Sequence, residues 1–176
     1  FYHVNKKYHG QFRLPPECSI YSTELTAIKK ALEYCVDNQE KHQFTIFTDS
    51  KGTISALQHF KPSCKMNYLV VDIIKLHEKL RQQNKEIILV WIKGHAGITE
   101  NVFGDSLAKQ ALRVGVILHD FKVPPSDMRV IIHEKQKEKW NAHYLSYPSG
   151  GHYKQIQRGL RSQVWFKDET NRRYIR

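Results

Sequence analysis

The stretch of sequence that decides the fold is Phe44-Thr45-Ile46-Phe47-Thr48-Asp49-Ser50. Its β-branched and aromatic residues predict a short strand, which ends abruptly at an acid and a serine. A second apolar run, residues 87–92, is rich in β-branched residues and predicts a strand that is buried on both of its faces. Residues 2–14 read as a pair of extended segments with a turn near His9 and Gly10.

Apolar residues with helical spacing surround the two predicted strands. One helix is predicted from Glu24 onward, with Ser22 or Thr23 as its N-cap. The apolar stripes of this helix and three others are Leu25, Ile28, Leu32 and Cys35; Ile54 and Leu57; Val70, Ile73, Ile74, Leu76 and Leu80; and Phe103, Leu107, Ala111 and Leu112. Strands that alternate with helices predict an α/β fold in which helices pack against a sheet.

The pattern changes at Val123-Pro124-Pro125, near which we predict a domain boundary: a main domain of residues 1–118 and a basic, mainly helical extension of residues 119–176. The chain has a formal net charge of +11, which favours polyanionic partners. Residues 121–176 contain 12 basic and 5 acidic side chains, so they supply +7 of this charge.

The extension has two possible interpretations. It is either a solubilising pair of helices anchored by buried tryptophans, or a surface that grips nucleic acid. The second interpretation uses Lys135, Lys137, Lys139, Arg158, Arg161, Arg172 and Arg173, with Trp140 and Trp165 as stacking faces.

Several classes of protein are disfavoured by composition. Cys18, Cys35 and Cys64 form no C-x-x-C pair, which argues against a zinc site or a disulfide framework. The longest apolar run is too short to cross a bilayer, and we predict no membrane association. No secretory signal pattern is present, so we expect an intracellular protein, in the nucleus or cytoplasm. Because the chain opens with Phe1 rather than Met, we expect a piece of a longer protein.

Three acidic residues occupy related positions. Asp49 ends a predicted strand, Glu24 opens a helix, and Asp105 is placed in the first turn of another helix. In an open α/β sheet functional groups gather beyond the strand ends, so these carboxylates could converge. Clustered carboxylates suit Mg²⁺ or Mn²⁺, and a pair of such ions is the usual arrangement for phosphodiester hydrolysis.

Four ordered motifs resemble the type 1 ribonucleases H. They are Ser22-Thr23-Glu24-Leu25-Thr26-Ala27-Ile28, the strand that ends in Asp49-Ser50, the loop Trp91-Ile92-Lys93-Gly94-His95-Ala96-Gly97-Ile98, and Asp105 ten residues after His95. The resemblance covers residues 2–112. The Gly-His-Ala-Gly-Ile loop and the basic tail are most similar to the RNase H domains of non-LTR retrotransposon polyproteins.

The resemblance implies a mixed β-sheet with flanking helices and an enzyme that cuts the RNA strand of RNA·DNA hybrids. Glu24, Asp49 and Asp105 would bind two Mg²⁺ or Mn²⁺ ions, and His95 would assist proton transfer and product departure. The positions that would lie near the hybrid backbone are Ser22, Thr23, Ser50 and Asn101. An upstream reverse transcriptase in the same polypeptide is a further expectation. The alternative is an impaired RNase H-like module that binds nucleic acid without cutting it.

Two departures from the family pattern bear on activity. The family's first strand, with its Asp-Gly-Ser stretch, has no counterpart here, because no aspartate precedes Asp37. We therefore expect the segment on its own to be inactive or poorly folded, and the preceding residues of its parent to restore hybrid cleavage. In addition, Val102 and Gly104 stand where relatives have glutamate and alanine.

Overall fold

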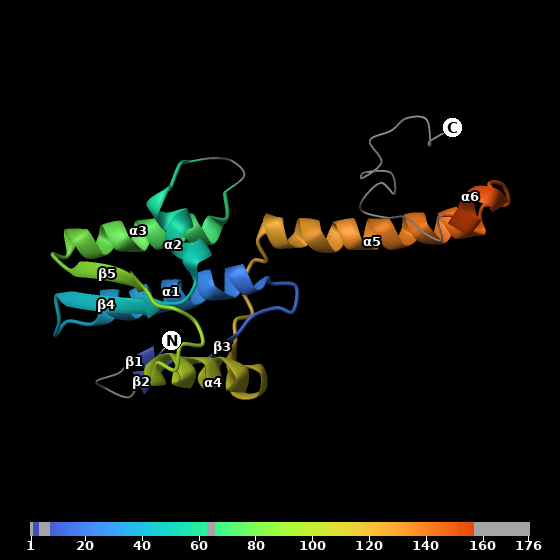
Figure 1. The fold of residues 1–176 in the computed structure, drawn as a ribbon. Helices are drawn as coiled ribbons and strands as arrows, with labels where there is room; N and C mark the ends of the chain where they lie inside the picture. Colours follow the sequence, from blue (N-terminus) through green and yellow to red (C-terminus); the bar gives the residue numbers. More distant parts are fainter. Residues whose placement is uncertain (1, 4–7, 63–65, 157–176) are drawn as a thin grey trace, which may run out of the picture. The chain divides into compact units, whose positions relative to one another are not determined.

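The computed structural model describes residues 2–3, 8–62 and 66–156 (Figure 1). The strands are β1 (Tyr2–His3), β2 (Tyr8–His9), β3 (Phe12–Arg13), β4 (Gln43–Thr48), β5 (Glu86–Trp91) and β6 (Val116–Ile117). The helices are α1 (Ile20–Asp37), α2 (Lys51–Gln58), α3 (Tyr68–Gln82), α4 (Thr99–Val114), α5 (Pro125–Ser146) and α6 (Gly151–Ile156). The predicted α/β fold, with helices beside a small sheet, is confirmed.

Two parallel strands form the centre of the structure. β4 pairs with β5 in a register that places Phe44 opposite Ile87 and Thr48 opposite Trp91, so both strands end at the same edge. β3 pairs in parallel with β6, a strand that the sequence pattern did not predict.

β1 pairs with β2 in the antiparallel sense, with Tyr2 opposite His9. The predicted turn near His9 and Gly10 is therefore wrong. The connection between the paired strands falls at residues 4–7, outside the described residues.

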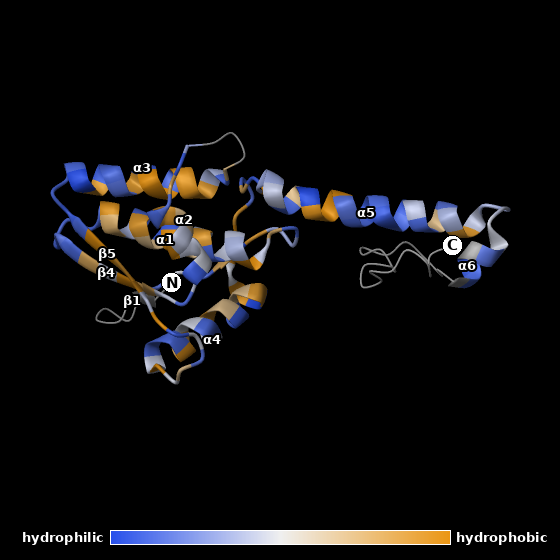
Figure 2. Cartoon of the chain, turned by 45° about the horizontal axis from the view of Figure 1, so that its top comes forward, coloured by the Kyte–Doolittle hydropathy of each residue, from blue (hydrophilic) through white to orange (hydrophobic). Residues whose placement is uncertain are grey.

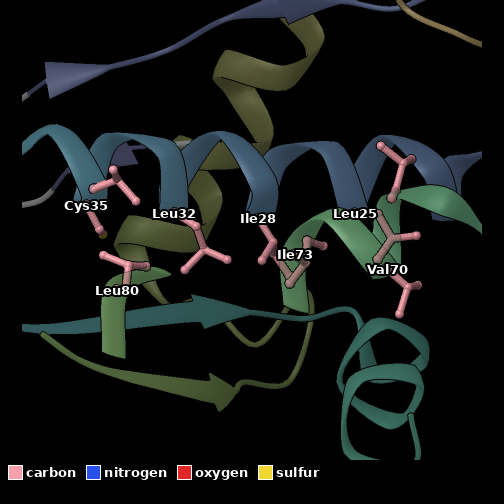
Figure 3. Close-up of a cluster of buried hydrophobic side chains, with 9 residues drawn as sticks. Leu25, Ile28, Leu32, Cys35, Val70, Ile73 and Leu80 are labelled. Carbon is pink, nitrogen blue, oxygen red and sulfur yellow. The ribbon is translucent and has the colours of Figure 1, made fainter. Parts of the chain in front are cut away.

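The hydrophobic core lies between α1, α3 and one face of the β4–β5 pair. Figure 3 shows Ile28 and Leu32 of α1 directed toward Ile73 and Leu80 of α3, with Leu25 beside Val70. The half-buried strand residues packed against this core are Phe44, Ile46, Ile87 and Leu89. Figure 2 shows the same separation, with orange inner faces and blue outer faces on α1 and α3. The predicted apolar stripes of both helices are confirmed.

The opposite face of the β4–β5 pair is open. Phe47 is 59% exposed and Ile88 is 49% exposed, and side chains alternate between exposed and half-buried along most of β5. The prediction that residues 87–92 are buried on both faces is therefore wrong. α1 and α3 cover only one face of the β4–β5 pair, so the side chains on its other face stay accessible to solvent.

α1 is held by polar groups at both of its ends. Its N-cap is Ser19, not Ser22 or Thr23 as predicted. At its other end the buried ammonium of Lys85 donates to the carbonyl oxygens of Cys35 (2.9 Å), Val36 (2.9 Å) and Asn38 (2.7 Å). A cation at a helix C-terminus is favourable, because the last carbonyls have no partner within the helix.

Asp127 anchors the start of α1. Its carboxylate accepts from the backbone N–H of Ser19 (2.8 Å), from the Ser19 hydroxyl (3.0 Å) and from the Ser126 hydroxyl (3.2 Å). Burial raises the pKa of Asp127, but hydrogen bonds from Ser19, Ser22 and Ser126 outweigh burial and leave that pKa below its ordinary value. A carboxylate beside a helix N-terminus is also favoured by the helix dipole.

The chain divides into two compact units, residues 1–128 and residues 129–176. Residues just before the division pack within the first unit: Phe121 lies against its core, and the Tyr68 hydroxyl donates to the carbonyl of Lys122 at 2.7 Å. The predicted domain boundary at residue 118 stays a prediction. No helix in the described part of the chain is long and apolar enough to cross a membrane.

In the extension, the helix predicted to precede Trp140 is α5, and it continues to Ser146. The predicted break at residues 149–151 is confirmed, since α6 begins at Gly151. The second predicted stripe, from Tyr153 to Val164, lies largely outside the described residues.

We predict that Asp127→Asn destabilises the chain at neutral pH by about 1–3 kcal/mol, the range for hydrogen bonds to a charged group. Folding lowers the pKa of Asp127, so its carboxylate stabilises the folded state at pH values above 3.8, the pKa in the unfolded chain. This stabilisation is lost as the pH falls through the lower pKa of the folded state. Urea unfolding at several pH values measures the difference. The exposed Asp120→Asn is the control, and a deficit that persisted undiminished in acid would contradict the prediction.

Candidate active site

The carboxyl end of β4 carries the first part of the site. Ser50 is the N-cap of α2, where its hydroxyl oxygen accepts from the N–H of Thr53. The same hydroxyl donates to the carboxylate of Glu24 on α1. Asp49, between the strand and this cap, is fixed at its backbone because Trp91 Nε1 donates to its carbonyl oxygen at 3.2 Å. One hydroxyl thus links the strand end to the helix that bears Glu24.

The loop after β5 meets Asp49. A Cβ atom at Gly94 would lie 2.9 Å from Asp49 Oδ2, closer than Cβ atoms approach other atoms in proteins. Glycine is therefore required for the observed approach of this loop to the Asp49 carboxylate. The sequence placed Gly94 in a glycine-rich loop but did not reveal this contact.

His95 follows on the same loop and faces Asp105. The His95 backbone adopts a left-handed conformation, with φ of 56°, which is uncommon for a residue other than glycine. Its Nδ1 atom lies 3.8 Å from Asp105 Oδ2, and its side chain is 91% exposed. An imidazole presented to solvent, with one nitrogen near a carboxylate, is suited to proton transfer.

Two predicted positions need correction. Asp105 is not in the first turn of its helix, because α4 begins at Thr99, six residues earlier. Glu24 does not open its helix, since α1 begins at Ile20. Both carboxylates therefore project from the second turn, where the helix dipole acts on them less strongly than on a first-turn residue.

The four predicted catalytic residues are linked by a series of contacts, the contact chain, in which two links run through the neighbouring residues Ser50 and Gly94 and only His95 and Asp105 face each other directly. Glu24 contacts the residue after Asp49, Asp49 contacts the residue before His95, and His95 faces Asp105. Within the described residues, however, no group of three or more His, Cys, Asp or Glu side chains is close enough together to hold a metal ion. The carboxylates supply oxygen ligands suited to Mg²⁺ or Mn²⁺, while their spacing does not form a closed cluster.

The residues predicted to lie near nucleic acid differ in exposure. Thr23 is exposed and Asn101 is half-buried. Ser50 is 6% exposed, and Ser22 is fully buried, with its hydroxyl oxygen accepting from Asn67 at 3.4 Å. In this structure Ser22 and Ser50 are therefore buried near the starts of α1 and α2. Thr23 is the most accessible of the four residues predicted to lie near nucleic acid.

Of the cysteines, Cys18 and Cys35 lie within the described residues, and neither contacts the four predicted catalytic residues there. Cys18 and Cys35 are free thiols, as predicted, and Cys64 lies outside the described residues. Burial raises the pKa of Cys35 to about 11, although the charge of Lys85 acts in the opposite direction. A thiol with so high a pKa is a poor nucleophile at neutral pH.

In a comparison with known families, the family model for RNase H matches residues 2–113. This range contains all four residues of the contact chain. A search of curated proteins finds no match.

We predict that Gly94→Ala turns the Asp49 carboxylate away from its present position. The new Cβ would meet the free end of a flexible side chain, so the cost to folding should stay within about 1–3 kcal/mol. The measurement is the carboxyl ¹³C chemical shift of Asp49. Gly104→Ala is the matched control, because an added Cβ there meets open space. An unchanged Asp49 signal in Gly94→Ala would show that the close approach does not exist in solution.

Proposed function

The chain belongs to the RNase H family, and from that premise we propose that it is a metal-dependent endonuclease that hydrolyses the RNA strand of RNA·DNA hybrids. We further propose that it acts within a longer protein of the retroelement type. The observation that carries the proposal is the contact chain from Glu24 through Asp49 and His95 to Asp105. It joins the strand end, two helices and the glycine loop at one edge of the sheet.

The proposed metal ligands are Glu24, Asp49 and Asp105, with Mg²⁺ or Mn²⁺ as the ions. When bound, such ions neutralise developing charge on the phosphate and lower the pKa of an attacking water. The donor chemistry agrees with this role, although the described residues do not gather three ligands in one group. The hydrogen bond from Ser50 orients the Glu24 carboxylate, and the absence of a side chain at Gly94 leaves room for that of Asp49.

His95 is proposed to move protons at the leaving oxygen of the cleaved strand. With Nδ1 directed toward Asp105, its other ring nitrogen is available to solvent and substrate. An imidazole has one nitrogen that can give a proton and one that can take a proton, which suits it to this transfer. The backbone at His95 is left-handed, and the ring that it carries is exposed to solvent.

Recognition of the hybrid is proposed to rest on its backbone. The net charge of +11 favours contacts with phosphates, which carry no sequence information. Discrimination of the RNA strand would come from its 2′-hydroxyl groups, for which Glu24 and the exposed Thr23 are the proposed partners.

A second candidate function is binding of nucleic acid without cleavage. It is favoured by one observation, the lack of a three-residue metal-binding group within the described residues. If the chain is a nuclease, loss of Asp49 should reduce cleavage and leave hybrid binding intact. If the chain only binds nucleic acid, loss of Asp49 should have no effect.

The test is cleavage of an RNA·DNA hybrid by the natural polypeptide that contains this chain, with added Mg²⁺. Asp49→Asn should lower kcat about a hundredfold or more, the scale of losing one group that stabilises the transition state. Hybrid binding without metal should be retained. Asp37→Asn, at the exposed end of α1, is the matched control and should cleave normally. Tight hybrid binding with no metal-dependent cleavage in the unmodified protein would favour the binding module instead.

A further inference from the structure

The part of α5 that belongs to the second unit, Arg129–Ser146, is solvated on nearly all sides. Most of its side chains are exposed, including Lys135 and Lys139. Trp140 is 69% exposed, so this tryptophan does not anchor the helix in a core. The interpretation of the extension as helices anchored by buried tryptophans therefore fails at Trp140, while Trp165 lies outside the described residues.

The charges of this helix are separated by side. At about 100° per residue, Glu134 and Glu138 share one narrow ridge. The lysines, Arg129 and Trp140 lie in a separate arc of roughly 200°, interspersed with uncharged residues such as Ile132 and Gln136. The cations of that arc are Arg129, Lys135, Lys137 and Lys139.

Some neighbouring charges on the helix repel one another, whereas Glu134 with Lys137 and Lys135 with Glu138 attract each other. Charged residues four apart carry like charges, as in Glu134 with Glu138 and Lys135 with Lys139, and opposite charges meet only at three-residue spacing. Like charges at four-residue spacing destabilise an isolated helix. Within the described residues, Lys135, Lys137 and Lys139 form no ion pair. A polyanion lying along the cationic arc would reduce the repulsion between Lys135 and Lys139.

The exposed indole indicates which polyanion. A membrane surface would require one continuous apolar face, but Val130, Ile132 and Leu145 are spread around the helix. In a duplex the base faces are already stacked on one another. In a single strand they are free to stack on an aromatic side chain flanked by cations.

We propose that residues 129–146 of α5 bind single-stranded nucleic acid, with Lys135, Lys137 and Lys139 contacting phosphates and Trp140 stacking on an unpaired base. This goes beyond the proposed nuclease function, because it requires neither the metal ligands nor cleavage. It gives the chain a second nucleic-acid surface outside the residues matched by the RNase H family model.

The test measures binding of the 176-residue chain to a fluorescent single-stranded oligonucleotide across a range of salt concentrations, without divalent metal. The variant Lys135→Gln/Lys137→Gln/Lys139→Gln should reduce the slope of log affinity against log salt by about 2, since each phosphate contact in a single strand contributes roughly 0.7. The matched control, Lys75→Gln/Lys79→Gln/Lys109→Gln, removes the same charge from exposed positions on α3 and α4 and should leave the slope unchanged.

Substitutions at Trp140 test the stacking contact. Trp140→Ala should weaken binding roughly 5- to 100-fold, the effect of losing one stacked base, and Trp140→Phe should restore most of the affinity. Affinity for a fully paired duplex should be little affected. Circular dichroism checks that each variant retains its helix.

Three results would overturn the proposal: equal slopes for the two triple variants, no effect of Trp140→Ala, or equal weakening of single-strand and duplex binding by that change. Asp49→Asn separates this proposal from the nuclease. It should bind the single strand normally, so failure of hybrid cleavage would leave the α5 result standing.

Discussion

The parallel pairing of β4 with β5 is the constraint on which the rest of the structure depends. Because Thr48 lies opposite Trp91, the residues that follow the two strands emerge at the same edge, and Asp49 meets the loop that contains Gly94. The same pairing presents one apolar face to α1 and α3, which supply most of the buried core. Packing and site geometry therefore arise from a single strand register, and a slip of one residue would disturb both.

α1 links stability to function in this molecule. Its apolar stripe fills the core, its second turn bears Glu24, and polar groups hold both of its ends. Asp127 at one end and Lys85 at the other come from segments far away in the sequence. Asp127 lies beyond the residues matched by the RNase H family model, so a segment that follows the match supports the helix that presents a proposed metal ligand, in agreement with a first compact unit that extends to residue 128.

Electrostatics divides the chain into two kinds of surface. At the strand edge, Glu24, Asp49 and Asp105 present carboxylates, and the solvent-exposed imidazole of His95 faces Asp105. On α5, cations and an exposed indole lie along one arc of the helix, where an anion would reduce the repulsion between Lys135 and Lys139. A nuclease that holds a strand at one surface and cuts at another would use both, and the two surfaces can be tested independently.

The sequence by itself determined the buried faces of α1 and α3, the strand that ends at Asp49 and the family, whereas in the stripe predicted for α4 Leu107 and Ala111 are buried and Phe103 and Leu112 are exposed. Each of these depends on spacing within a short segment, as Leu25, Ile28 and Leu32 illustrate, or on ordered motifs. Tertiary structure alone decided the N-cap at Ser19, the close approach of Gly94 to Asp49 and the open outer face of β5. These features join residues tens of positions apart, or depend on which surfaces remain uncovered. Local periodicity reports which side of an element is apolar; only the packed chain determines what lies against it.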